Sequence, residues 1–109
     1  MLKQDTLNDN DDTPLHYAAL KESVEIVKVL IAIGTDPNIK NNKHNTPLHY
    51  ASHSNSSEMA KFLIDSGANI NEMNKEKEIP LHYAAKFNNF EVAKILLDAG
   101  TYINTKNKR

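Results

Sequence analysis

Histidine is the residue type in this chain with the most to offer chemically. Five histidines stand among 109 residues, and imidazole serves both as a general acid or base and as a metal ligand. His49 and His53, with His44 nearby, form the one local cluster, and their i, i+4 spacing on a helix would suit zinc. His16, His49 and His82 follow one another every 33 residues. That regular interval favours a repeated structural position over a shared ion.

Other catalytic chemistry finds less support. The chain has no cysteine, which excludes a thiolate nucleophile and a cysteine zinc site. It has no glycine-rich phosphate loop. No serine or threonine stands in a plausible arrangement with histidine and aspartate outside the repeated positions. We therefore predict a protein that is not an enzyme, with no catalytic, cofactor-binding or metal-binding residues; a histidine-based metal hydrolase is the alternative that this pattern all but excludes.

Composition limits the partners. The chain has 14 acidic and 13 basic residues, for a formal charge of −1. A nucleic-acid binder of this size usually carries a basic excess. The longest apolar run, 29–33, is too short to span a bilayer, and the first ten residues lack the apolar segment of a secretory signal. We expect no nucleic acid, no membrane insertion and a cytoplasmic or nuclear location.

The sequence motif that contains three of these histidines occurs three times. The letters TPLHYA begin at Thr13 and again at Thr46, and IPLHYA begins at Ile79. Leucines and glycines further along keep the same 33-residue register. The aligned columns divide the chain into a linking segment at 1–12 and units at 13–45, 46–78 and 79–109, the last of which ends in a second linking segment.

Each unit is predicted to contain two helices and a connector. A threonine hydroxyl can cap free backbone N–H groups, and proline suits the first helical position. Leu15, Ala18 and Ala19 then form one apolar face, and a second helix spans about 24–33 and ends at Gly34. One such pair cannot cover its own apolar face, so the units must stack and share a core.

These columns resemble the ankyrin repeat, through TPLHYA at 13–18 and 46–51, GANIN at 67–71, and the period itself. The resemblance implies one all-α domain over 1–109: a solenoid of stacked helix-turn-helix pairs with β-hairpin-like loops, here called fingers. It also implies a non-catalytic protein–protein interaction module. A structural spacer within a larger ankyrin-array protein, with no partner of its own, is the alternative function.

The sequence departs from the family pattern where the family usually has glycine, at the fingertips and between the two helices of each unit. Asparagine tolerates a positive φ moderately well, and Glu, Lys and His tolerate it less well. We expect strained or reshaped tips, and a cost on the order of 1 kcal/mol at each unfavourable site. In the family the motif threonine and histidine bond to each other and to the adjoining backbone, so Ile79 should remove one cap. The glycine positions are occupied here by Asp11, His44, Lys77, Glu22, Asn55 and Asn88.

Partners of ankyrin arrays usually contact the fingertips and the exposed side of the first helices, which line a concave groove. Leu20 and Phe87 are apolar where the family is often polar, so they would anchor a protein or peptide at the two ends of the groove, although single surface apolar residues are also normal. Tyr17, Tyr50 and Tyr83 form a column after the motif histidines. Two explanations of this tyrosine column stay open, as spacers between helices or as groove contacts. The predicted partner-binding residues are Asp12, Tyr17, Leu20, Lys21, Lys43, Asn45, Tyr50, His53, Glu78, Tyr83, Lys86 and Phe87.

Neither end of the chain reads as a polar capping repeat, because the first unit carries the same inward apolar residues as the second. We therefore expect an excerpt of a longer array, or ends that something else covers. The start is acidic and the finish basic, which solvated surfaces explain. A monomer is expected, with end-to-end association as the alternative.

Overall fold

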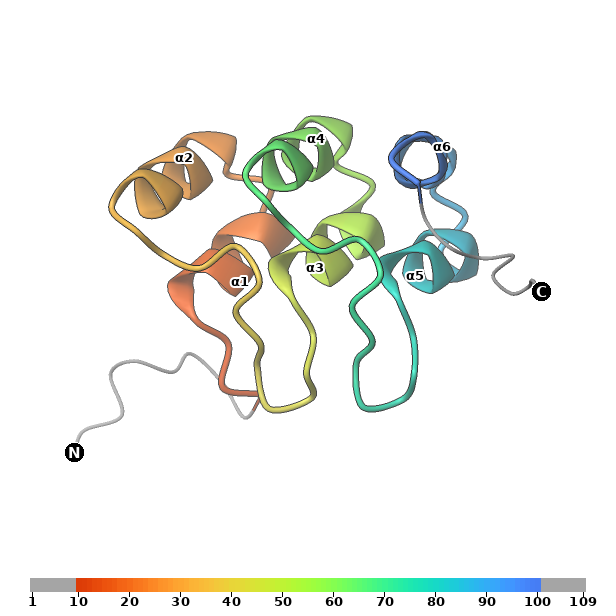
Figure 1. The fold of residues 1–109 in the computed structure, drawn as a ribbon, viewed down its shortest axis with the longest axis horizontal. Helices are drawn as coiled ribbons and strands as arrows, with labels where there is room; N and C mark the ends of the chain where they lie inside the picture. The colour runs from red at the N-terminus through yellow and green to blue at the C-terminus, as the bar shows by residue number, and fades with distance from the viewer. Residues whose placement is uncertain (1–9, 101–109) are drawn as a thin grey trace.

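The computed structural model describes residues 10–100, and the outer parts of both predicted linking segments, 1–9 and 101–109, lie outside them. Helices α1, α3 and α5 form one row and helices α2, α4 and α6 form a second row beside it (Figure 1). The architecture is the predicted all-α stack of helix pairs. The helix bounds are Pro14–Leu20 for α1, Val24–Ala32 for α2, Pro47–Ser54 for α3, Ser57–Asp65 for α4, Pro80–Lys86 for α5 and Phe90–Asp98 for α6.

The first helix of each unit begins as the Thr-Pro pair predicts. The hydroxyls of Thr13 and Thr46 accept hydrogen bonds from the backbone N–H groups of His16 and His49, and each helix has proline in its first turn. Ile79 has no hydroxyl and caps nothing with its side chain, which confirms the predicted loss. Its side chain is buried instead, with 7% exposed, so burial of apolar surface offsets part of the missing cap.

The second helices end at glycines in the left-handed region. Gly34, Gly67 and Gly100 have φ angles of 104°, 105° and 97°, which an L side chain adopts only with strain. The six expected non-glycine positions also have positive φ, between 56° and 65°. The sequence therefore keeps the family's backbone at these sites with residues that fit it less well.

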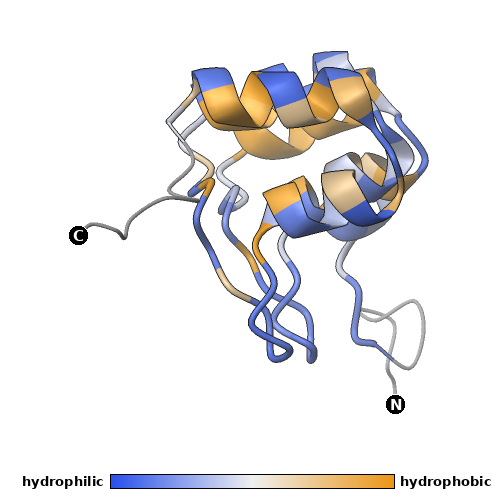
Figure 2. Cartoon of the chain, turned by 90° about the vertical axis from the view of Figure 1, so that its right-hand side faces the viewer, coloured by the Kyte–Doolittle hydropathy of each residue, from blue (hydrophilic) through white to orange (hydrophobic). Residues whose placement is uncertain are grey.

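The core lies between the two rows of helices, where the apolar faces turn toward each other (Figure 2). Leu15, Leu48 and Leu96 are completely buried there, together with Val27 and Leu63. Buried residues from all three units belong to one continuous cluster. This is the shared core that a repeat needs, because no single helix pair can close its own apolar face.

The fingers project from one side of the stack (Figure 1). The backbone N–H groups of Asn41 and Asn74 donate to the carbonyls of Asn45 and Glu78, at 3.0 and 2.9 Å, and close two hairpin-like turns. Neighbouring fingers are also joined, since the N–H of Lys75 donates to the carbonyl of Lys43 at 3.0 Å. Residues 10–100 contain no β-strand, so turn hydrogen bonds give the fingers their hairpin-like shape.

Candidate protein-interaction surface

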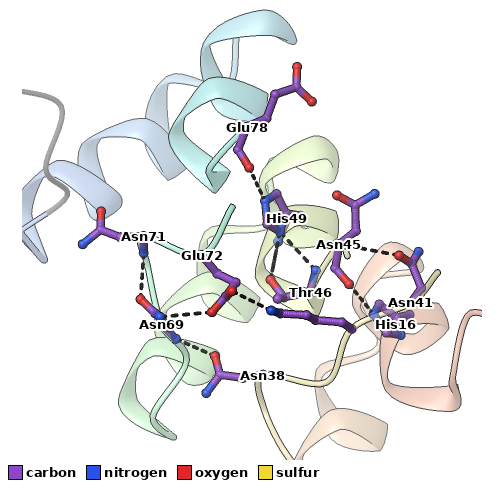
Figure 3. Close-up of polar contacts among 11 residues, drawn as sticks. His16, Asn38, Asn41, Asn45, Thr46, His49, Asn69, Asn71, Glu72 and Glu78 are labelled. Carbon is purple, nitrogen blue, oxygen red and sulfur yellow. Dashed lines mark hydrogen bonds and ion pairs between the residues drawn. The ribbon is translucent and has the colours of Figure 1, made fainter. Parts of the chain in front are cut away.

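The motif histidines hold the stack together. The Nδ1 atom of His49 accepts from the N–H of Thr46 at 3.1 Å, and its Nε2 atom lies 2.8 Å from the carbonyl oxygen of Glu78 in the next finger (Figure 3). Because a carbonyl only accepts, Nε2 carries the proton and donates it. His16 repeats the arrangement with Thr13 and with the carbonyl of Asn45. Each of these histidines thus connects the start of its own helix to the following finger.

This engagement leaves the motif histidines little chemical freedom. Burial lowers the pKa of both His16 and His49, although the backbone carbonyls that they contact act in the opposite direction. Both ring nitrogens of His49 have protein partners, so the zinc-like pair with His53 would have to break the stack to bind an ion. Among residues 10–100, no three histidine, cysteine, aspartate or glutamate side chains are grouped as metal ligands.

The tyrosine column divides into different environments. The Tyr50 side chain is 9% exposed, and its hydroxyl donates to the Asp12 carboxylate at 2.7 Å. The Tyr83 hydroxyl likewise lies 3.3 Å from Oδ1 of Asn45. Both tyrosines therefore fasten a finger to the next helix pair, as a spacer would, whereas Tyr17 is 41% exposed. The predicted contact residues Asp12 and Asn45 are both buried, and they are the hydrogen-bond partners of these two tyrosines.

Six of the predicted residues surround one hollow of about 310 Å³ on the surface. Leu20 comes from the end of α1 and His53 from the end of α3, whereas Phe87 follows α5. We call this the apolar hollow, and three successive units build it. Leu20 and Phe87 thus lie on opposite sides of one hollow instead of at separate ends of a long groove. Its lining residues are Leu20, Tyr50, His53, Tyr83, Lys86 and Phe87.

Ring contacts fix the shape of the apolar hollow. The rings of His53 and Phe87 meet edge to face with centroids 4.4 Å apart, and Tyr83 and Phe87 meet in the same way at 6.1 Å. Such pairs add stabilisation beyond the area that they bury. Phe87 is nevertheless 42% exposed, so its ring is both held in place and accessible.

Lys86, which lines the apolar hollow, forms an ion pair with Glu78. The Lys86 ammonium lies 2.9 Å from the Glu78 carboxylate and also within 5.2 Å of the Tyr83 ring centroid. The hydrogen bond between them lowers the pKa of Glu78 and raises the pKa of Lys86. Both groups are charged at neutral pH, and the pair brings two predicted contact residues together.

A second, polar hollow of about 390 Å³ lies between the fingers. It shares Tyr83 with the apolar hollow, so the two adjoin. Asn74 also lines it, and this residue is absent from the predicted set. The signal that could have identified it is its alignment with Asn41 in the previous finger. The lining residues are Asn10, Lys43, Asn45, Asn74, Lys75, Glu76 and Tyr83.

The remaining predicted residues lie beside these hollows rather than in them. The Lys21 ammonium is 5.7 Å from the Tyr17 ring centroid, and neither residue lines the apolar or the polar hollow. The sequence pattern therefore found the face that carries the hollows but could not rank the residues on it. Whether any of the twelve contacts a partner stays a prediction.

The fold and this surface define a class of protein: an α-helical solenoid built from stacked helix pairs with projecting fingers. A family model described as "Ankyrin repeats (3 copies)" matches residues 1–41 and 15–107, and the chain belongs to the ankyrin repeat family. Ankyrin repeats generally mediate protein–protein interactions and are typically non-catalytic. The comparison with curated proteins gave no match. Within residues 10–100, no helix has the length and apolar character needed to cross a membrane.

Proposed function

We propose that the chain is a non-catalytic interaction module that presents the apolar hollow and the adjoining polar hollow to a protein or peptide. The observation that carries this proposal is the convergence of Leu20, His53 and Phe87, from three different units, on one accessible hollow. Only a stacked array can bring these residues together. The hollow is therefore a property of the repeat architecture and a natural place for a partner's side chain.

The chemistry of the two hollows suggests how binding would work. An apolar side chain of the partner would enter beside Phe87 and bury the ring surface that is now exposed. The polar hollow would supply hydrogen bonds and charges from Lys43 and Lys75 around that anchor. Interfaces of this kind take most of their energy from a few anchors surrounded by polar contacts.

Rigidity supports the same proposal. The fingers are bonded to each other through backbone groups, and the rings around Phe87 pack on one another. A surface that is already ordered loses little conformational entropy on binding. A cytoplasmic or nuclear location remains part of the proposal, on the sequence grounds given above.

The deciding experiment compares Phe87→Asp with Met73→Asp in affinity purification from the source cell. Both residues are exposed and apolar, at 42% and 54%, but only Phe87 lines the hollow. Phe87 is accessible but also packs on His53 and Tyr83. We therefore expect the Phe87 variant to lose its partner with only a small drop in melting temperature, while the Met73 variant keeps both. Leu20→Asp serves as a second variant, provided that its melting temperature is checked, since Leu20 also packs against the core.

A structural spacer would give a different result. Proteins recovered with the chain would then be the same for the unmodified protein and for the Phe87 and Leu20 variants. That outcome would remove the interaction module as the proposed function and leave the spacer.

A further inference from the structure

The outer face of the first unit exposes positions that are buried in the other two. Ile26, Met59 and Val92 occupy one column of the repeat. Met59 and Val92 have no exposed surface, whereas Ile26 is 53% exposed. The same backbone position is therefore covered wherever a unit precedes it and open in the unit that has none before it among the described residues.

Other columns show the same difference on α1 and α2. Val29 is 59% exposed, but its counterparts Phe62 and Ile95 are half-buried and pack against the core. Pro14 is exposed while Pro47 and Pro80 are buried, and Tyr17 is exposed while Tyr50 is buried. We call this the leading face. The four residues that define it are Pro14, Tyr17, Ile26 and Val29, and their side chains carry one polar group, the tyrosine hydroxyl.

The last unit shows the complementary pattern. His16 and His49 are completely buried, yet His82 in the same column is exposed. Ala19 and Ser52 are buried, yet Ala85 is exposed. We call this the trailing face, on α5 and α6. It contains a hollow of about 300 Å³ lined by Ala84, Ala85, Asn88, Asn89, Phe90 and Ala93.

We propose that the trailing face of one molecule docks on the leading face of a second copy of this chain. Inside each molecule the two kinds of face already pack on each other between successive units, so the docked pair would continue an interface that the chain itself establishes. No other partner is needed to explain the complementarity, because one sequence carries both halves of it.

The repeat predicts specific contacts across this junction. Ile26 of the second copy takes the place that Met59 and Val92 take within the chain, and covers the small side chain of Ala85. The Nε2 atom of His82 donates to the backbone carbonyl of Asp12 of the second copy, as His16 donates to the carbonyl of Asn45 at 2.8 Å. That carbonyl of Asn45 accepts from the Asn41 N–H as well, so a carbonyl in this column accommodates two donors.

The geometry makes the contact heterologous, since two different faces meet. Each added molecule leaves one leading face and one trailing face free, and such contacts give open chains unless the rotation closes a ring. Association would therefore proceed beyond dimers as concentration rises. This self-association is independent of partner binding at the apolar hollow, because neither face includes Leu20, His53 or Phe87.

Two substitutions test the proposal by sedimentation velocity on the full chain, from micromolar to millimolar concentration. Ile26→Glu blocks the leading face and Ala85→Glu blocks the trailing face, both at exposed positions. The unmodified chain is expected to form a concentration-dependent series of oligomers, and each variant alone is expected to stay monomeric. An equimolar mixture is expected to form dimers and nothing larger, because it offers one intact leading face and one intact trailing face.

Each variant measured alone distinguishes the proposed contact from pairing between two identical faces. If the Ile26 variant alone forms dimers, two trailing faces are pairing, and if the Ala85 variant alone does so, two leading faces are; either result overturns the proposal. A chain that stays monomeric throughout this range overturns it too, and leaves these faces for further repeats or another protein. Phe87→Asp, in the apolar hollow, is the control. It is expected to associate like the unmodified chain, whether or not the apolar hollow binds a partner.

Discussion

The Tyr50 hydroxyl donates to the Asp12 carboxylate at 2.7 Å, although 38 residues separate the two in the sequence. The same carboxylate accepts from the side-chain amide of Asn41 at 2.8 Å. Asp12 ends one finger, Asn41 begins the next, and Tyr50 belongs to α3. One buried acid therefore ties two fingers and a helix together. Burial first, and then the hydrogen bond to Asp12, raise the pKa of Tyr50.

Replacing Tyr50 by Phe should destabilise the chain. The substitution removes a hydrogen bond to a buried charged group, for which about 1.5–3 kcal/mol is typical. We expect the lower end of that range, because Asn41 still donates to Asp12. The measurement is the free energy of unfolding in urea.

Tyr17→Phe is the matched control for that prediction, since Tyr17 is in the same column and 41% exposed. It should change the free energy of unfolding by no more than about 0.5 kcal/mol. Equal losses in the two variants would show that the bond to Asp12 contributes nothing.

Tyr17 and Tyr50 also show how much of the structure could be predicted from the sequence. The helix starts at Thr13 and Thr46, the glycine helix ends and the shared core were predictable, because each depends on neighbours within one repeat or on the period itself. The site was predicted less well. Tyr17 and Tyr50 stand in identical hexapeptides, and their exposure differs because, among the described residues, a unit precedes Tyr50 and none precedes Tyr17.

The burial of Asp12 and Asn45 escaped prediction for a related reason. Both look like ordinary polar turn residues, and what covers them is a tyrosine from a segment far along the chain. The apolar hollow, in contrast, was within reach of the sequence. Leu20 and Phe87 were singled out as apolar residues at positions that are often polar, and the structure brings them to the same hollow.

Acid should weaken the fold at a pH where most carboxylates are still charged. His16 and His49 have lowered pKa values, chiefly because burial disfavours the charged ring. The unfolded chain takes up protons near pH 6.5 and the folded chain only at lower pH. Stability is therefore complete above that pH and falls as the pH drops toward the folded-state pKa. Protonation would also place a donor at Nδ1, opposite the backbone N–H of Thr13 or Thr46.

Urea unfolding at neutral pH and about one unit below pH 6.5 tests this, because the loss of stability between the two reports the extra protons that the unfolded chain binds. Glu78, whose pKa is also lowered, begins to lose its stabilising contribution only near the usual carboxyl pKa, which lies below both pH values of this comparison. A variant with His44→Asn and His53→Asn, both at exposed histidines, should show the same loss. If it abolished the pH dependence, the motif histidines would not be its source.

Replacing Glu22 by Gly should stabilise the chain. Glu22 has a φ of 61° in the turn between α1 and α2, and glycine adopts this region without the steric cost that a Cβ brings. We expect a gain of about 0.5–1 kcal/mol, somewhat less than the strain of such a site because glycine also loses more entropy on folding. The thermal midpoint of the variant measures the gain.

Asn55→Gly provides the comparison, since Asn55 has a φ of 56° in the equivalent turn of the second unit. Asparagine tolerates this conformation better than glutamate does. The gain should therefore be smaller than at Glu22. A larger gain at Asn55 would mean that something other than backbone strain sets the stability of these turns.

Truncating one column of the repeat should have unequal effects along the stack. Met59 has no exposed surface and Ile26 is 53% exposed, although both occupy the same position of the second helix. Met59→Ala would leave a cavity at the junction of two units, which typically costs about 2–5 kcal/mol. Ile26→Ala, measured in dilute solution where no second copy covers it, should cost far less, because little apolar burial is lost and no closed cavity forms. Urea unfolding of both variants is the measurement, and similar losses of stability at the two positions would contradict the difference in burial between the first and second units.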